Sequence, residues 1–232
     1  MPNSKEADME IASTSYAPYA PYAISRNGPD RAAYDRVKRI VDLAFTSAAL
    51  PLLSPFLLLI ALAVKLEEPS SPALYVQTRL GKDGKPFRIY KFRSMVGDAD
   101  KQLDRIRHLN EIEGAMFKIK DDPRITKLGR FLRKTSLDEL PQLFNVMRGD
   151  MSLVGPRPPL PEEVQRYSGY DHLRLQVKPG CTGLWQVSGR NRLHFPEMVK
   201  MDLDYIERRS IWLDMKLIAK TVIVMLRSKD AY

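Results

Sequence analysis

A run of 25 almost wholly apolar residues is the strongest constraint on what this chain can fold into. From Ile40 to Val64 the sequence reads IVDLAFTSAALPLLSPFLLLIALAV, and Asp42 is its only charged residue. As one straight helix the run would rise about 37 Å, enough to cross a hydrocarbon layer of roughly 30 Å. Pro51 and Pro55 each remove a backbone donor, so we expect a bend near Ser54. The two arms would then rise about 21 and 15 Å, and neither would cross the layer alone.

Charged residues on both sides of the run limit how it can meet a membrane. The flanking cations are Arg31, Arg36, Lys38, Arg39 and Lys65. Because cations beside a membrane segment favour the cytoplasmic side, the N-terminal end is expected to stay there. A spanning helix would place the remaining chain on the opposite side, whereas a re-entrant helix would return it to the cytoplasm. A kinked core helix in a soluble protein is the alternative, although so long an apolar run exceeds what a small domain needs.

The length, charge and cysteine content of the chain bound its class. Its 232 residues suffice for one sizeable domain, or a smaller one with a membrane attachment. The net charge of +9 indicates an anionic partner, which leaves nucleic acid, phosphate-bearing substrates and acidic lipid headgroups open. Cys181 is the only cysteine, which excludes an intramolecular disulfide and a thiolate metal cluster and fits a reducing, cytosol-facing location.

The N-terminal residues differ from the rest of the chain in composition. Residues 1–33 contain the echo YAPYAPYA and no sustained apolar period, and they lack the pattern of a signal peptide. They are therefore predicted to be a disordered tail. The expected organisation is this tail, a membrane helix over residues 34–66, and a folded domain over residues 67–232.

Residues 73–95, ALYVQTRLGKDGKPFRIYKFRSM, predict a β-hairpin whose strands join through Asp83 and Gly84. Alternation in the second strand places Lys91 and Arg93 on one face, about 7 Å apart along the chain. This face either binds phosphate or is simply solvated. The hairpin occurs among several helical patterns without the regular alternation of a doubly wound sheet, which predicts an α+β fold.

Helical periodicity recurs elsewhere in the chain. It predicts a surface helix over residues 98–113, a short helix from Pro161, and two helices between Glu197 and Arg227. The last of these carries an apolar stripe. Such a stripe is typical both of a helix on a bilayer surface and of one packed on a core, and both interpretations remain open.

The segment from Lys134 to Pro158, KTSLDELPQLFNVMRGDMSLVGPRP, carries the main chemical signal. Ser136 followed by Glu139 predicts an N-cap and capping box, which places Asp138 and Glu139 in the first turn of a helix. The helix dipole alone favours acidic residues there, so the pair has a structural explanation as well as a chemical one. Cations accumulate just before this segment and at its start: Arg124, Lys127, Arg130, Arg133 and Lys134.

This segment resembles the signature of the bacterial sugar transferase family. The resemblance runs from about Tyr34 to Arg227 and includes GAMFKIKDDPRIT and GLWQVSGR, which are similar to hexose-transferring members. The family comprises monotopic phosphoglycosyl transferases, which pass a sugar 1-phosphate from a nucleotide sugar to a polyprenyl phosphate. Ser54 and Pro55 match the hinge of the family's re-entrant membrane helix. The resemblance thus implies a phosphoglycosyl transferase domain over residues 67–232.

The resemblance also implies a reaction. Asp138 would be the nucleophile that takes hexose 1-phosphate, glucose or galactose, from a UDP-sugar and releases UMP. The second displacement would pass the phosphosugar to undecaprenyl phosphate, initiating an exopolysaccharide or related glycan with ping-pong kinetics. Glu139 is expected to position or deprotonate the acceptor. Mg²⁺ is the implied metal, with Asp138 as its protein contact.

Further site residues follow by match to the family's motifs. Lys91, Arg133 and Arg157 are the expected phosphate ligands. Four more residues are candidates for nucleotide or substrate contacts: Arg93, Asp122, Arg124 and Arg190. For Arg190, a surface arginine after a turn is an equal alternative.

The implied partners are a UDP-sugar, a polyprenyl phosphate and membrane lipid, with a homo-oligomer left open. The implied location is the inner, cytoplasmic membrane with the catalytic domain facing the cytoplasm. A competing hypothesis is a basic membrane-associated adaptor that binds nucleic acid or acidic lipid without chemistry. We expect no nucleic-acid partner, because the cations crowd around an Asp-Glu pair rather than exposed aromatic residues.

Overall fold

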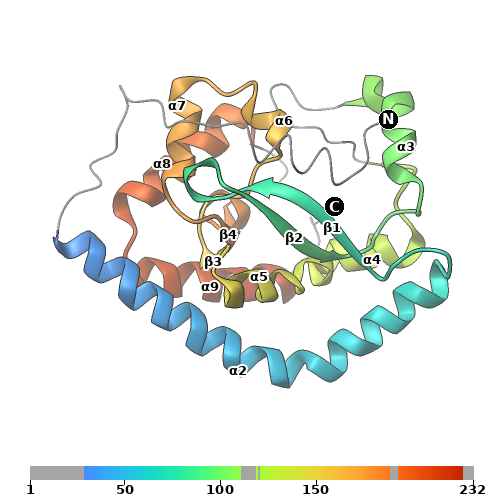
Figure 1. Ribbon diagram of the computed structural model, residues 1–232, viewed down its shortest axis with the longest axis horizontal. Coiled ribbons are helices and arrows are strands. Elements are labelled where there is room, and N and C mark those ends of the chain that lie inside the picture. Colours follow the sequence, from blue (N-terminus) through green and yellow to red (C-terminus); the bar gives the residue numbers. More distant parts are fainter. Residues whose placement is uncertain (1–28, 111–118, 120, 189–192, 227–232) are drawn as a thin grey trace.

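Helix α2 (Pro29–Glu67) runs along one side of the molecule in the computed structural model, which describes residues 29–110, 119, 121–188 and 193–226. Figure 1 shows that α2 is continuous but bent, with its two arms rising toward the rest of the chain. Pro51 and Pro55 lie inside it, and the Ser54 hydroxyl donates to the Pro51 carbonyl at 2.8 Å. Residues 29–33, predicted as tail, are helical, whereas the remainder of that tail lies outside the described residues.

The N-terminal arm of α2 is held to the folded domain by polar contacts. The Arg39 guanidinium donates to the carbonyls of Val146 and Met147 at 2.6 and 2.9 Å. Lys38 pairs with Asp214 at 2.7 Å. Asp42 is buried and accepts the backbone N–H of Leu153 at 3.1 Å. Asp42, the one charged residue within the apolar run, therefore helps to hold α2 against the folded domain.

The C-terminal arm of α2 packs through apolar side chains. Leu57, Ile60 and Val64 are buried against Phe92 and Leu132. Partly buried leucines extend this cluster toward the Asp-Glu pair: Leu128, Leu137 and Leu140. This arm thus supports the part of the chain that carries the candidate site.

Much of α2 is nonetheless exposed. It is the one described helix long and apolar enough to cross a membrane, and only 17% of its most apolar window is buried. Its large exposed side chains are Val37, Ile40, Phe45, Leu52, Phe56, Leu58, Leu59, Leu62 and Leu66. A soluble core helix would have these side chains covered, so the structure disfavours that alternative.

The predicted hairpin is confirmed. Strands β1 (Leu74–Leu80) and β2 (Pro86–Phe92) pair antiparallel, with Tyr75 opposite Lys91. A short 3-10 turn (Lys82–Gly84) joins them, in which Asp83 and Gly84 both adopt positive φ, 58° and 73°. Aspartate and glycine tolerate this conformation, which explains why the pair specifies the turn.

A second, very small sheet was not predicted. Strands β3 (Ser152–Val154) and β4 (Gly180–Thr182) pair in parallel, and a Cβ on Gly180 would lie 2.0 Å from the Gly155 nitrogen. This close approach requires glycine. The sheet lies in the larger core cluster with α8 (Phe195–Arg208) and α9 (Ile211–Leu226), the two predicted C-terminal helices.

Shorter helices complete the described chain. The predicted surface helix is present as α3 (Ala99–Ile106) and a 3-10 turn (Arg107–Leu109), and the rest of it falls mostly outside the described residues. The predicted helix at Pro161 is confirmed as α6 (Pro161–Val164). The others are α4 (Lys127–Thr135), a 3-10 turn (Leu137–Glu139), α5 (Gln142–Arg148), α7 (Gly169–His172) and 3-10 turns at Leu173–Gln176 and Trp185–Val187. This mixture of helices and small sheets is an α+β fold, as predicted.

Candidate active site

The Asp-Glu pair lies in a tight corner between two helices, not at the start of one α-helix. Ser136 adopts a left-handed conformation (φ 57°) and closes α4, with its N–H bonded to the Arg133 and Leu132 carbonyls. Its side chain makes no capping hydrogen bond, so the predicted capping box is wrong. Asp138 and Glu139 occupy the 3-10 turn that follows, and α5 begins only after Pro141. Proline suits a helix start, which is why the helix begins later than predicted.

Asp138 is a buried carboxylate with a perturbed pKa. Its exposed fraction is 7%. Burial, followed by the adjacent negative charge of Glu139, raises the pKa of Asp138 to about 6, against the opposing effect of Lys91 and Arg133. The group is thus ionised near neutral pH but poorly solvated. A carboxylate in this state is suited to act as a nucleophile.

Lys91 reaches the pair from the hairpin. Its ammonium lies 2.7 Å from Glu139 Oε1, and both side chains are partly exposed. The structure therefore places Lys91 beside the Asp-Glu pair, as the sequence predicted. Partial exposure leaves the cation reachable by a second anion.

Arg133 approaches from α4. Its Nε donates to the Ser94 hydroxyl at 2.8 Å, which fixes the plane of the guanidinium. Burial lowers the pKa of Arg133, while the charge of Asp138 opposes this effect. The guanidinium remains charged at any physiological pH, so it supplies a fixed positive charge close to Asp138.

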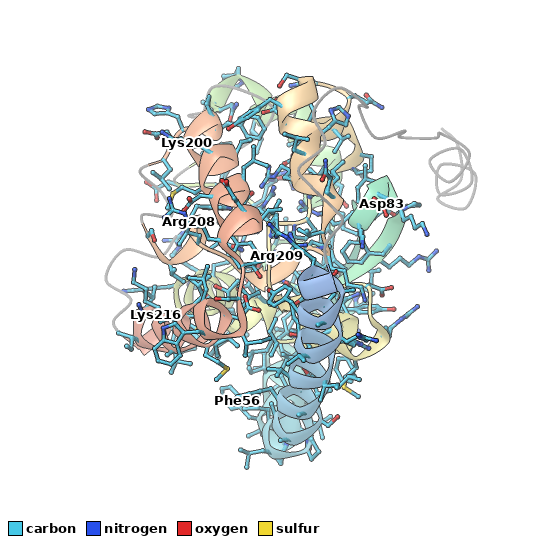
Figure 2. All side chains as sticks on the ribbon, turned by 90° about the vertical axis from the view of Figure 1, so that its left-hand side faces the viewer. Phe56, Asp83, Lys200, Arg208, Arg209 and Lys216 are labelled. Atoms are coloured by element: carbon cyan, nitrogen blue, oxygen red, sulfur yellow. The ribbon has the colours of Figure 1, made fainter. Side chains whose placement is uncertain are left out.

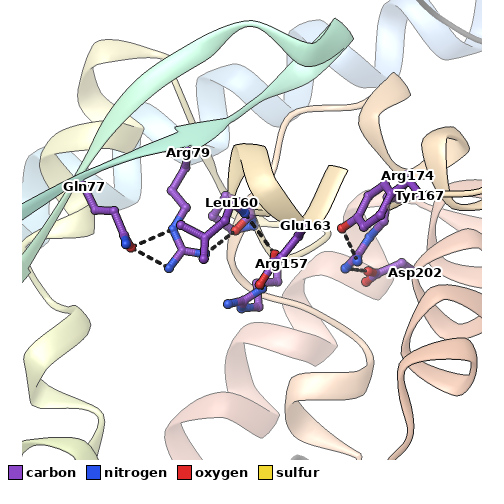
Figure 3. A network of polar contacts seen from close by, with 9 residues as sticks. Gln77, Arg79, Arg157, Leu160, Glu163, Tyr167, Arg174 and Asp202 are labelled. Atoms are coloured by element: carbon purple, nitrogen blue, oxygen red, sulfur yellow. Dashed lines mark hydrogen bonds and ion pairs between the residues drawn. The ribbon is translucent and has the colours of Figure 1, made fainter. Parts of the chain in front are cut away.

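Arg157 lies in the loop that follows β3. Figure 3 shows it paired with Glu163 of α6 and close to Arg79 of β1. Arg157 Nη1 lies 3.1 and 3.3 Å from the two carboxylate oxygens of Glu163. Burial alone would raise the pKa of Glu163, but Arg157 and Arg79 hold it below its ordinary value. Glu163 is therefore an ionised counter-ion to this pair of arginines.

Two residues predicted to contact the nucleotide, Asp122 and Arg124, form an ion pair with each other. Asp122 and Arg124 are both buried and form a two-pronged ion pair, with distances of 2.9 and 2.7 Å. Arg124 also donates to the Ala99 carbonyl at 3.2 Å. Burial opposes ionisation of Asp122, yet its bonds to Arg124 keep its pKa below the ordinary value. The structure thus gives this pair a scaffolding position near Arg133.

Of the other predicted contacts, Arg93 has partners of its own on the hairpin side and Arg190 lies outside the described residues. Arg93 donates to the Pro72 carbonyl at 2.8 Å and stacks over Tyr75. Ser54 and Pro55 belong to α2, as described above.

Sequence reasoning missed Arg79 and Glu163. The signal for Arg79 was present, because Tyr75, Gln77 and Arg79 alternate along β1 and Tyr75 is opposite Lys91. Strand pairing therefore places Arg79 on the same hairpin face as Lys91. Glu163 gave no such signal, since its role depends on how α6 packs against the hairpin.

The carboxylates present fit the requirements of Mg²⁺. Among the described residues, no three histidine, cysteine, aspartate or glutamate side chains gather into a metal cluster. Mg²⁺ commonly takes only one or two carboxylates, with substrate phosphates and waters supplying the other ligands. Asp138 and Glu139 provide that number of hard oxygen donors.

The corner combines a buried carboxylate, a second carboxylate and two cations, Lys91 and Arg133, with Arg79 also close enough to act on Glu139. The bacterial sugar transferase family model matches residues 33–228, which includes every one of these groups. The chain belongs to the bacterial sugar transferase family. The match covers nearly the range predicted from the sequence, so the family assignment is confirmed.

Relatives of known name agree with this assignment. The galactosyl transferase CpsE of Streptococcus agalactiae is 49% identical over 84% of this chain and 43% of its own length. The UDP-glucose:undecaprenyl-phosphate glucose-1-phosphate transferase of Caulobacter vibrioides is 42% identical over 87% and 74%. The exopolysaccharide production protein ExoY of Rhizobium meliloti is 40% identical over 84% and 88%. The chain spans less than half the length of several other curated relatives that it matches.

Proposed function

We propose that this member of the bacterial sugar transferase family transfers hexose 1-phosphate, of glucose or galactose, from a UDP-sugar to undecaprenyl phosphate and releases UMP. One observation carries the proposal: Asp138 is buried, has a pKa of about 6, and lies between cations beside the arm of an exposed apolar helix. The names of relatives that use UDP-glucose or act in exopolysaccharide production support it. The product would initiate an exopolysaccharide or a related glycan.

In the first displacement, a carboxylate oxygen of Asp138 attacks the phosphorus that bears the sugar. The bond from this phosphorus to the bridging oxygen of the diphosphate breaks, and UMP leaves with the electron pair. The enzyme then carries a phosphosugar on Asp138. Lys91, Arg133 and Arg157 offset the negative charge of the phosphates, which would otherwise repel the attacking carboxylate.

In the second displacement, a phosphate oxygen of the polyprenyl phosphate attacks the same phosphorus. The bond to Asp138 breaks, and the side chain regains its carboxylate. Glu139 follows Asp138 in the chain and lies 2.7 Å from Lys91, which supports a role in orienting the acceptor or accepting its proton. Because donor and acceptor use the site in turn, the kinetics are ping-pong.

Mg²⁺ would be held by Asp138, with phosphate oxygens and waters completing its shell, and would neutralise phosphate charge. Its contribution can be measured separately from that of the side chains. Removal of divalent cations with a chelator is expected to abolish UMP release without unfolding the protein, and added Mg²⁺ is expected to restore it. Full activity in the chelator would contradict this assignment.

The apolar surface of α2 supports a re-entrant attachment to one leaflet. Figure 2 shows Phe56 at one end of the molecule, with Lys200, Arg208, Arg209 and Lys216 all away from that end. On α9, which packs against α2, Trp212, Val222 and Ile223 are also exposed. The bend of α2 would lie among the acyl chains, with α9 near the headgroups and the catalytic domain in the cytoplasm.

Cysteine labelling tests this topology. In a Cys181→Ser background, we expect Ala33→Cys and Ser70→Cys to react with an impermeant reagent only when the cytoplasmic side is accessible. Reaction of the two cysteines from opposite sides would show a spanning helix and would contradict the re-entrant proposal.

The activity is tested by UMP release. Detergent-purified protein is incubated with Mg²⁺ and a panel of UDP-sugars, with and without undecaprenyl phosphate. We expect acceptor-dependent turnover of UDP-glucose or UDP-galactose by the wild type and none by Asp138→Asn. Salt-dependent binding to DNA, without turnover of any UDP-sugar, would support the adaptor hypothesis instead.

A further inference from the structure

Arg79 is a buried guanidinium that binds only neutral acceptors among the described residues. Its Nε and Nη2 donate to Gln77 Oε1 at 3.1 and 2.7 Å, and its Nη1 donates to the Pro158 carbonyl at 3.1 Å (Figure 3). Its exposed fraction is only 8%. A buried arginine normally pairs with a carboxylate, because an unpaired buried charge is costly. This position therefore calls for a functional explanation.

The charge of Arg79 is felt at the candidate site. Burial, followed by the positive charge of Arg157, lowers the pKa of Arg79 to about 10, while Glu163 and Glu139 oppose the shift. Arg79 thus stays protonated at neutral pH. It lies close enough to both Arg157 and Glu139 to change the potential there.

The hairpin and Glu163 together hold the loop that carries Arg157. The Leu80 N–H donates to the Pro159 carbonyl at 3.0 Å, one residue beyond the bond from Arg79. Glu163 accepts the Leu160 N–H at 2.9 Å and also binds Arg157. Two successive peptide units, 158–159 and 159–160, are thereby fixed by three hydrogen bonds. Such a loop can present one side chain in a single geometry.

Arg157 keeps unused donors. Only its Nη1 is bonded, to Glu163, whereas Nε and Nη2 have no hydrogen-bond partner among the described residues. Its side chain is 24% exposed, in contrast to the buried Arg79. The free edge of this guanidinium matches the two-oxygen face of a phosphate.

We propose that Arg79, held by Gln77, is a positioning residue that sets the Arg157 loop so that the free guanidinium edge meets a substrate phosphate. This inference rests on the proposed function, because it assigns a diphosphate substrate to the same site. Arg79 itself does not touch the substrate, since its three donor nitrogens already bind Gln77 and Pro158.

A double-mutant cycle tests the inference. Arg79→Lys keeps the positive charge but cannot hold Gln77 and Pro158 with one planar fork. Arg157→Lys keeps the charge but removes the two-pronged edge. For both variants and their combination, we would measure the KM and kcat for UDP-sugar turnover and the affinity for inorganic pyrophosphate. Arg208→Lys, at an exposed position on α8, is the matched control.

We expect each single variant to raise KM and weaken pyrophosphate binding about tenfold or more, with a smaller change in kcat. The combined variant should be about as impaired as Arg157→Lys alone, because Arg79 acts through Arg157. If the two losses instead multiply, or if wild-type protein binds no pyrophosphate, the inference is overturned. Arg208→Lys should match wild type.

A second variant guards against misfolding of Arg79→Lys. Gln77→Ala keeps both arginines but removes the acceptor of two Arg79 bonds, so it should weaken pyrophosphate binding several-fold only while Arg157 is present. Equal weakening in the Arg157→Lys background would contradict the inference. The two proposals can fail separately. If the wild type turns over no UDP-sugar, the proposed function fails. The positioning role still holds in that case if the combined variant binds pyrophosphate about as weakly as Arg157→Lys alone. Turnover of a UDP-sugar with an additive cycle would support the proposed function and overturn the positioning role.

Discussion

Two arginine-carboxylate pairs in the same part of the molecule, Arg174–Asp202 and Arg157–Glu163, differ in how far the arginine is exposed. Arg174 and Asp202 are both almost fully buried, their bond is reinforced by Tyr167, and the pair joins the turn after α7 to α8 (Figure 3). Arg157 and Glu163 are held at 3.1 Å, but Arg157 keeps a partly exposed edge. The first pair is closed and stabilises the fold, whereas the second is open and can accept another anion. For these two pairs, we propose that exposure of the arginine, rather than its charge, separates the structural pair from the one that binds substrate.

The largest effect should come from breaking the closed pair. Arg174→Met leaves Asp202 buried without its cation, and we expect a loss of about 3–5 kcal/mol in the free energy of unfolding. Chemical denaturation in detergent would measure it. Replacing both partners, as Arg174→Met with Asp202→Leu, should recover much of the loss. A single variant as stable as wild type would contradict the structural role of this pair.

Breaking the open pair should affect activity instead. Arg157→Ala removes a proposed phosphate contact, and we expect kcat/KM for UDP-sugar turnover to fall by about 10²-fold or more. Thermal denaturation should show a smaller change than for Arg174→Met, because Glu163, although buried, keeps the Leu160 N–H bond and the positive charge of Arg79. If Arg157→Ala unfolds at the temperature of the assay, the Arg157–Glu163 pair stabilises the fold as the Arg174–Asp202 pair does, and the proposed difference between them is wrong.

The pH dependence of the first displacement should report Asp138. Its pKa is raised to about 6, and in the proposed mechanism the ionised form is the nucleophile, so UMP release should be lost as pH falls through about 6 and level off above it. Lys91 lowers the pKa of Asp138, so Lys91→Met should move this acidic limb to higher pH by up to about one unit. If the acidic limb of UMP release lies at the same pH in Lys91→Met as in the wild type, a group other than Asp138 controls the pH dependence.

The smallest effect should come from an exposed pair. Arg208 and Asp204 lie 2.8 Å apart on the surface of α8, one turn apart. Because water and salt screen such pairs, Arg208→Ala should change stability by about 0.5 kcal/mol or less and leave UDP-sugar turnover unchanged. If Arg208→Ala lowered the free energy of unfolding as much as Arg174→Met does, exposure of an ion pair would not predict its contribution to stability.

The sequence predicted those features that depend on local chemistry. Asp83 and Gly84 fit a turn with two positive φ angles, so the hairpin was predictable. Lys91 followed from alternation along the strand and from the family motif. The apolar run predicted a helix, and its prolines predicted the bend visible in Figure 1.

The features that sequence reasoning missed depend on contacts between distant residues. Ser136 resembles an N-cap, but its left-handed conformation ends α4 because a second helix begins so soon afterwards. The parallel pairing of β3 and β4 involves three residues each, too few to give a periodic signal. Asp42 interrupts the apolar run in the sequence, and only the folded chain brings Leu153 to it as a partner. Local patterns do not encode such pairings.

Mass spectrometry of a trapped covalent intermediate would show whether Asp138 is the nucleophile. Wild-type protein would be incubated with Mg²⁺ and UDP-galactose or UDP-glucose without acceptor, quenched, and analysed intact and after digestion. We predict a mass increase of one hexose phosphate on the peptide that contains Asp138, removed by undecaprenyl phosphate and absent from Asp138→Asn. Acceptor-dependent turnover with no adduct, or an adduct on another residue, would contradict Asp138 as the nucleophile.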